Sequence, residues 1–135
     1  MGQISKLIIL DRDGVINFDS DRYIKSPEEW QPIPGSLEAI ARLTQNGWHI
    51  AVATNQAGIG RGLFDMAALN AMHAKMHRLV SQCGGRIDAV FYCPDTDLSQ
   101  SLCRKPMPGM FHAIAERFNT PLSGVPAIGD ALRDQ

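Results

Sequence analysis

Hydrophobic residues along the chain fall into short runs that alternate with stretches of helical periodicity. Four apolar runs predict strands at Leu7–Leu10, Trp48–Thr54, Ile87–Tyr92 and Val125–Ile128. Apolar residues spaced three or four apart predict three helices, which carry Leu37, Ile40 and Leu43, then Leu69, Met72, Met76, Leu79 and Val80, then Phe111, Ile114 and Phe118. Start and stop signals agree with these bounds, at Pro34-Gly35-Ser36, Gly47, Asp65 and Gly84-Gly85.

The alternation of strands and helices predicts the fold class. It favours an α/β fold in three layers, with a parallel sheet and helices on both faces. Runs that are apolar at every position fit parallel strands buried on both sides. The length of 135 residues suits one compact domain over residues 1–135. In such sheets ligands bind beyond the carboxyl ends of the strands.

Polar motifs follow the predicted strands at the edge where ligands bind. They are Asp11 and Asp13 after the first strand, Thr54 and Asn55 at the end of the second, Arg104 and Lys105 before the third helix, and Asp130 after the fourth strand. Taken alone, each motif has a plain structural interpretation as a turn, a cap or a solvated loop. Their order along the chain, on one predicted edge, favours a functional site.

The acidic residues predict a magnesium site. Two carboxylates buried at the end of an apolar strand cost free energy unless a positive group pairs with them. Asp11, Asp13 and Asp130 offer hard oxygen ligands, which suit Mg2+ rather than zinc. A site with so few protein ligands would keep waters and accept phosphate oxygens from a substrate.

The same residues supply the parts that phosphoryl transfer needs. Asp11 can act as the nucleophile and form an aspartyl-phosphate. Asp13 can protonate the departing alkoxide and then activate water. Donors for the phosphoryl oxygens and for a second anionic group are the side chains of Thr54, Asn55, Lys105 and Arg104.

The motifs, in this order, resemble those of the haloacid dehalogenase (HAD) superfamily of aspartate-nucleophile phosphatases. They read "DRDGV", "ATNQ", "RKP" and "GDALRD". The longer segments "DRDGVIN", "SPEEWQPIPGSLEAIARL", "TNQAGIGRG" and "CRKPMPGM" look like the D-glycero-D-manno-heptose 1,7-bisphosphate 7-phosphatase group. This resemblance implies a Rossmann-like fold without a large cap domain, and removal of the 7-phosphate of a heptose bisphosphate.

The resemblance also implies a role for each matching residue. Asp11 would be the nucleophile and Asp13 the acid/base, and Mg2+ would be held by Asp11, Asp130 and the backbone carbonyl of Asp13. Thr54 and Lys105 would steady the phosphoryl group. The other substrate-binding residues would be Asn55, Gln56, Arg61, Arg104 and the loop Asp19, Ser20, Asp21, Arg22 and Tyr23.

A structural zinc site found in many relatives is predicted to be absent here. Cys93 and Cys103 match two of its ligands, whereas Asp95 and Ser101 occupy the other two positions. Two thiols alone do not make a closed tetrahedral site. Both cysteines are therefore expected to be small buried side chains.

Composition leaves few other function classes open. A net charge of −1 gives no bulk attraction to nucleic acid or to an anionic membrane. Three cysteines do not suggest a disulfide framework, and no apolar run is long enough for a signal peptide or membrane span, so a cytoplasmic location is expected.

His73 and His77 lie in "HAKMH", which lacks the glutamate of a metalloprotease motif, and are expected to be exposed helical residues.

Alternative functions remain open at this point. They are a histidinol-phosphate or other small-molecule phosphatase, and a non-catalytic phosphate-binding remnant. Compared with the family pattern, the chain is expected to lack a last βα element after Asp130, which would leave that strand at a sheet edge. A monomer is expected unless a partner covers this edge.

Overall fold

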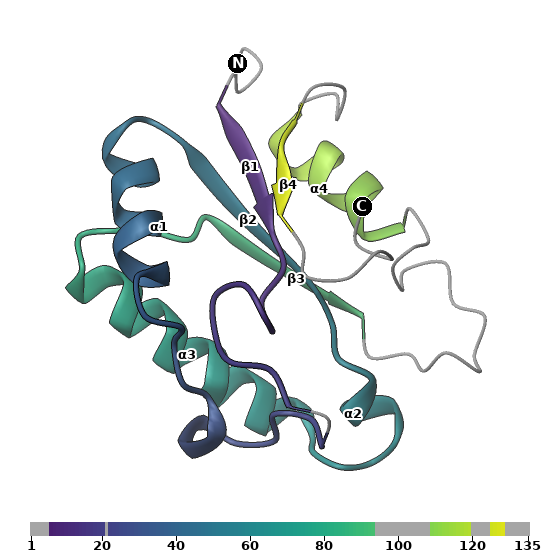
Figure 1. The fold of residues 1–135 in the computed structure, drawn as a ribbon. Coiled ribbons are helices and arrows are strands. Elements are labelled where there is room, and N and C mark those ends of the chain that lie inside the picture. The colour runs from purple at the N-terminus through teal and green to yellow at the C-terminus, as the bar shows by residue number, and fades with distance from the viewer. Residues whose placement is uncertain (1–5, 21, 94–108, 120–124, 129–135) are drawn as a thin grey trace.

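Four parallel strands form the central sheet in the order β3-β2-β1-β4 (Figure 1). The computed structural model describes residues 6–20, 22–93, 109–119 and 125–128. The strands are β1 (Leu7–Leu10), β2 (His49–Asn55), β3 (Ala89–Cys93) and β4 (Ala127–Ile128). All four predicted strands are therefore present: β1 has the predicted bounds, and the ends of the other strands differ from the predicted ones by at most two residues.

Helices lie on both faces of the sheet. They are α1 (Ser36–Gln45), the short α2 (Ala57–Gly60), α3 (Met66–Gln82), α4 (Gly109–Phe118) and a 3-10 turn, η1 (Pro27–Glu29). Figure 1 shows α1 and α3 on one side of the sheet and α4 on the other. This arrangement confirms the predicted three-layer α/β class. The sequence pattern did not predict α2 or η1, because both are too short to show a period.

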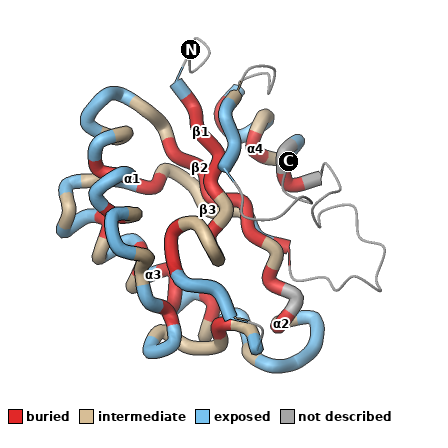
Figure 2. The backbone as a smooth tube through the Cα atoms, viewed as in Figure 1, coloured by how far each residue is buried: buried red, intermediate tan, exposed pale blue. Residues whose placement is uncertain are grey.

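Two separate apolar layers follow from the alternation of side chains along the strands. In β1, Ile8 and Leu10 face the layer beneath α1 and α3, whereas Leu7 and Ile9 face the layer beneath α4. Every residue of β1 is buried, and Figure 2 shows β1 and most of β2 as buried, whereas β4 is exposed. The prediction of strands buried on both faces is therefore confirmed for β1 and β2. It is wrong for β3, which is mostly half-buried, and for β4, which is exposed, because these two strands are the edges of the described sheet.

The start of α3 shows why the chain folds locally as the sequence suggests. Asp65 adopts an extended conformation, and its carboxylate accepts a hydrogen bond from the amide of Ala68 at 2.9 Å. This capping bond satisfies one of the helix's unpaired amides. Leu69, Met72 and Met76 then recur on the buried side of α3. The predicted cap and buried face are both confirmed.

Cys93 ends β3 and is fully buried, as predicted. It is also disulfide-bonded, so the expectation of a simple buried thiol is wrong. Asp95, Ser101 and Cys103 lie outside the described residues, and the absence of zinc stays a prediction.

In the part of the chain that the structure describes, no helix is long and apolar enough to cross a membrane.

Candidate active site

A tight turn at the carboxyl end of β1 carries the two predicted catalytic carboxylates. The amide of Asp11 donates to the carbonyl of Ile128 at 2.9 Å, which extends the pairing of β1 with β4. The chain then turns back, and the carbonyl of Arg12 accepts from the amides of residues 15–17. Gly14 has φ 86°, a left-handed conformation that favours glycine, and its amide donates to the carbonyl of Asn17. The turn thus favours the glycine of the DxDG motif.

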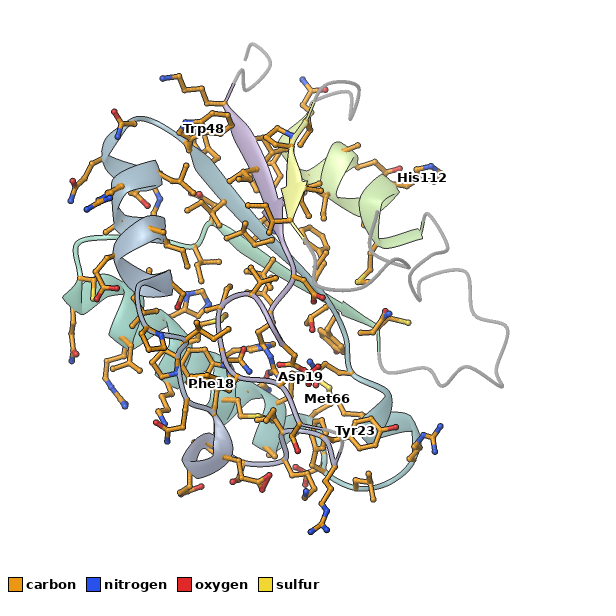
Figure 3. All side chains as sticks on the ribbon, in the orientation of Figure 1. Phe18, Asp19, Tyr23, Trp48, Met66 and His112 are labelled. Carbon is orange, nitrogen blue, oxygen red and sulfur yellow. The ribbon has the colours of Figure 1, made fainter. Side chains whose placement is uncertain are left out.

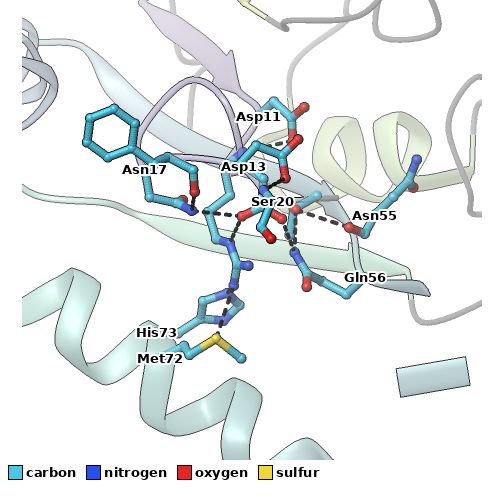
Figure 4. Close-up of polar contacts among 12 residues, drawn as sticks. Asp11, Asp13, Asn17, Ser20, Asn55, Gln56, Met72 and His73 are labelled. Carbon is cyan, nitrogen blue, oxygen red and sulfur yellow. Dashed lines mark hydrogen bonds and ion pairs between the residues drawn. The ribbon is translucent and has the colours of Figure 1, made fainter. Parts of the chain in front are cut away.

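Asp13 is the most heavily hydrogen-bonded side chain of this turn (Figure 4). Its Oδ1 accepts from Arg12 Nε at 2.7 Å and from Asn17 Nδ2 at 3.0 Å, and its Oδ2 accepts from Gln56 Nε2 at 3.3 Å. The side chain keeps 20% of its surface exposed. Three donors therefore fix the carboxylate while one side of it still faces solvent.

Gln56 connects this turn to the end of β2. Besides Asp13, its Nε2 contacts the hydroxyl oxygen of Thr54 at 2.9 Å, and its backbone amide donates to the carbonyl of Cys93 at 2.7 Å. Thr54 and Gln56 are both buried, and Asn55 between them is partly exposed. The structure thus brings together the predicted site residues at the ends of β1 and β2.

Asp11 lies beside Asp13 in the same turn (Figure 4). Its Oδ1 accepts from the backbone amide of Arg12 at 2.8 Å, and the residue is partly exposed. The two side chains present carboxylate oxygens at the edge of the sheet where a ligand is expected. Among the described residues no group of three or more His, Cys, Asp or Glu side chains forms a metal site, and the predicted third ligand, Asp130, lies outside them.

Arg12 and His73 are site residues that sequence reasoning missed. Arg12 is fully buried, and its Nη1 lies 3.3 Å from Nε2 of His73 on α3. The prediction that His73 is exposed is therefore wrong: it is 9% exposed, whereas His77, one turn later, is exposed as predicted. The sequence did carry a sign of the role of Arg12. Two carboxylates buried at a strand end need a positive partner, and Arg12, which lies between them, is the nearest one.

The loop after the turn is exposed and meets the segment after α2. Ser20 organises this loop through two hydrogen bonds of 3.1 Å. The hydroxyl of Ser20 accepts from the backbone amide of Arg22, and the carbonyl of Ser20 accepts from the backbone amide of Tyr23. Tyr23 has φ 67°, which is uncommon for a residue with a Cβ. The guanidinium of Arg61 lies 5.9 Å from the centre of the Tyr23 ring, within the range of a cation–π contact. Figure 3 shows Asp19 and Tyr23 along this loop.

The structure describes part of the predicted group of site residues. Its described members lie on the turn after β1, the end of β2, the loop up to Tyr23 and the segment after α2. The predicted residues that lie outside the described ones are Asp21, Arg104, Lys105 and Asp130.

Comparisons with known proteins support the resemblance noted in the sequence. The model of the family described as haloacid dehalogenase-like hydrolase matches residues 3–134. A D-glycero-beta-D-manno-heptose-1,7-bisphosphate 7-phosphatase of Bordetella bronchiseptica is 60% identical over 129 residues, covering 96% of this chain and 72% of that protein. The enzyme of the same name from Neisseria meningitidis serogroup A is 57% identical, with 96% and 69% covered.

A solved structure agrees with the sequence match. D,D-heptose 1,7-bisphosphate phosphatase from B. bronchiseptica, complexed with magnesium and phosphate, superposes with a TM-score of 0.93 at 60% identity, covering 96% of this chain and 72% of that one. At this identity and overlap, the shared fold and the shared motifs point to the same family. The chain therefore belongs to the haloacid dehalogenase-like hydrolases.

Proposed function

We propose that the chain is a Mg2+-dependent phosphatase that removes the 7-phosphate of D-glycero-D-manno-heptose 1,7-bisphosphate. The observation that carries this proposal is the 60% identity to a heptose bisphosphate phosphatase over 96% of the chain. The arrangement of Asp11 and Asp13 in one turn at the carboxyl end of β1 supports it. We further propose that residues 1–135 act as one catalytic domain, located in the cytoplasm.

The residues at this turn fit a magnesium ion. The side chains that the turn presents at the sheet edge are carboxylates, and Mg2+ prefers oxygen ligands. Asp11, the backbone carbonyl of Asp13 and, outside the described residues, Asp130 would hold the ion. When bound, it would neutralise charge on the phosphoryl oxygens during the reaction.

Two carboxylates in this turn allow a two-step hydrolysis. In the first step an Asp11 oxygen attacks phosphorus, a bond forms between them, and the bond from phosphorus to the sugar oxygen breaks. Asp13 gives its proton to that leaving oxygen. In the second step Asp13 takes a proton from water, whose oxygen attacks phosphorus, and the Asp11 carboxylate and inorganic phosphate are released. The hydrogen bonds that hold Asp13 supply the orientation that both transfers need.

The remaining predicted residues would bind the substrate. Thr54, Asn55 and Gln56 lie at the end of β2, where they could contact the phosphoryl oxygens, with Lys105 as a positive charge. Arg104 would bind the second phosphate. The loop Asp19, Ser20, Asp21, Arg22 and Tyr23 would contact the sugar, and the contact of Arg61 with Tyr23 would hold this loop against the segment after α2.

The test is phosphate release with Mg2+ and with EDTA. The substrates compared would be heptose 1,7-bisphosphate, fructose 1,6-bisphosphate, histidinol phosphate and a 3′-phosphorylated oligonucleotide. We expect metal-dependent turnover that is fastest on the heptose bisphosphate. Faster turnover of another ester would replace the proposed substrate, and turnover unaffected by EDTA would exclude the proposed metal.

A pair of variants tests the nucleophile. Asp11→Asn should abolish phosphate release, because an amide oxygen cannot form a stable phosphoryl ester. Asp65→Asn is the matched control, since asparagine caps a helix about as well as aspartate. Substantial turnover by Asp11→Asn would exclude Asp11 as the nucleophile.

A further inference from the structure

Arg12 links the catalytic turn to α3 through the protein interior. Its guanidinium is fully buried, with Nε 2.7 Å from Asp13 Oδ1 and Nη1 3.3 Å from His73 Nε2 (Figure 4). Nη1 also lies 4.0 Å from the sulfur of Met72. The chain of contacts therefore runs from His73 through Arg12 to the carboxylate of Asp13.

The direction of the His73 hydrogen bond follows from chemistry. A guanidinium has only donors, so Nε2 of His73 must accept, and the imidazole proton must be on Nδ1. Burial, together with the charge of Arg12, lowers the pKa of His73 to about 4. His73 is therefore neutral near pH 7, in the form that can accept from Arg12.

His73 is also the main restraint on the far end of the guanidinium. Among the described residues Nη2 of Arg12 has no hydrogen-bond partner, and a thioether such as that of Met72 is a weak acceptor. Without the imidazole, Nη1 would lose its one nitrogen or oxygen acceptor in the described part of the chain. Among the described residues, the buried guanidinium would then keep its bond to Asp13 through Nε and only the weak contact of Nη1 with Met72.

We infer that His73 is a positioning residue for catalysis: by accepting from Arg12 it fixes the guanidinium that orients Asp13. This inference rests on the proposed role of Asp13 as acid/base. Asn17 and Gln56 also hold the carboxylate, so loss of His73 should misalign Asp13 rather than release it. Misalignment of a proton donor slows the chemical step and leaves substrate binding unchanged.

Three variants test the inference through the separation of kcat from KM. His73→Leu removes the acceptor at similar volume, and we expect kcat to fall about tenfold with KM unchanged, as is typical when the partner of a site residue is removed. His73→Gln offers an amide oxygen as acceptor and should restore most of kcat. His77→Leu, on the exposed side of the same helix, is the matched control and should behave as wild type.

The outcomes separate positioning from a purely structural role. If His73→Leu lowers the melting temperature but keeps wild-type kcat, or if His73→Gln is as slow as His73→Leu, the inference is wrong. A 15N spectrum of the wild-type imidazole gives a readout without activity, and should show the Nδ1–H tautomer at pH 7.

Failure of the proposed phosphatase function can be distinguished from failure of the positioning role of His73. If the wild type releases no phosphate from any ester, the proposed function fails, and the positioning role is then judged by the Arg12 Nε–H signal. That signal should exchange slowly with water in the wild type and in His73→Gln, and fast in His73→Leu. Equal exchange in all three proteins would overturn the inference.

Discussion

The burial of His73 predicts a specific loss of stability in mild acid. Its pKa is lowered from 6.5 to about 4, first by burial, then by the charges of Arg12 and His77, with Asp13 acting in the opposite direction. Above pH 6.5 the imidazole is mostly neutral in both the folded and the unfolded chain, so it adds little pH dependence to the free energy of unfolding. Between pH 6.5 and 4 the unfolded chain binds a proton that the folded chain does not. Stability must therefore fall as the pH falls through this window.

The size of the effect follows from the shift. A pKa unit corresponds to about 1.4 kcal/mol, so the whole shift of His73 amounts to roughly 3 kcal/mol, reached below pH 4. Integrating the proton uptake gives a loss of about 2 kcal/mol between pH 7 and pH 5. Because His73 is only 9% exposed, solvent screening reduces this figure little.

Urea unfolding at pH 7 and pH 5 measures the effect. His73→Gln has no titrating group at this position, so its stability should fall by about 2 kcal/mol less than that of the wild type over this interval. His77→Gln removes an exposed histidine of the same helix, whose charge is a smaller cause of the lowered pKa of His73 than burial, and should keep most of the pH dependence of the wild type. Equal pH dependence in the wild type and His73→Gln would refute the assignment of His73 as a buried neutral group.

Three further changes test how the framework around the site is held. Asp65→Ala removes the capping bond to the Ala68 amide and should lower the free energy of unfolding by about 1 kcal/mol; an unchanged urea midpoint would contradict the cap. Gly58→Ala should cost about 1–3 kcal/mol, because a Cβ there would lie 2.3 Å from the Phe64 ring. A melting temperature equal to that of wild type would show that Phe64 moves freely. Lys75→Met removes two hydrogen bonds, at 2.8 and 2.7 Å, to backbone carbonyls of the segment around η1, and should cost about 1–3 kcal/mol in urea unfolding. No loss would mean that these bonds are replaced by water.

Local sequence determined most of the framework. The apolar run of β1 predicted a strand buried on both faces, and Asp65 with the periodic residues after it predicted the start of a helix. The turn that carries Asp11 and Asp13 was also readable, since Gly14 adopts the left-handed conformation that such a turn needs. These features depend on residues close together in the chain, so pattern and propensity were sufficient.

Tertiary structure decided which side chains support the carboxylates. Arg12 and His73 are 61 residues apart, and Gln56 and Asp13 are 43 apart, so no local pattern marks either pair. The helical period placed Met72 on the buried side of α3 but left His73 beside it as an ordinary surface residue. The turn after β1 carries Arg12 into the interior beside that helix, and a buried guanidinium needs acceptors. Sequence therefore set the strand and the carboxylates, whereas packing between β1 and α3 selected the buried partners that hold them.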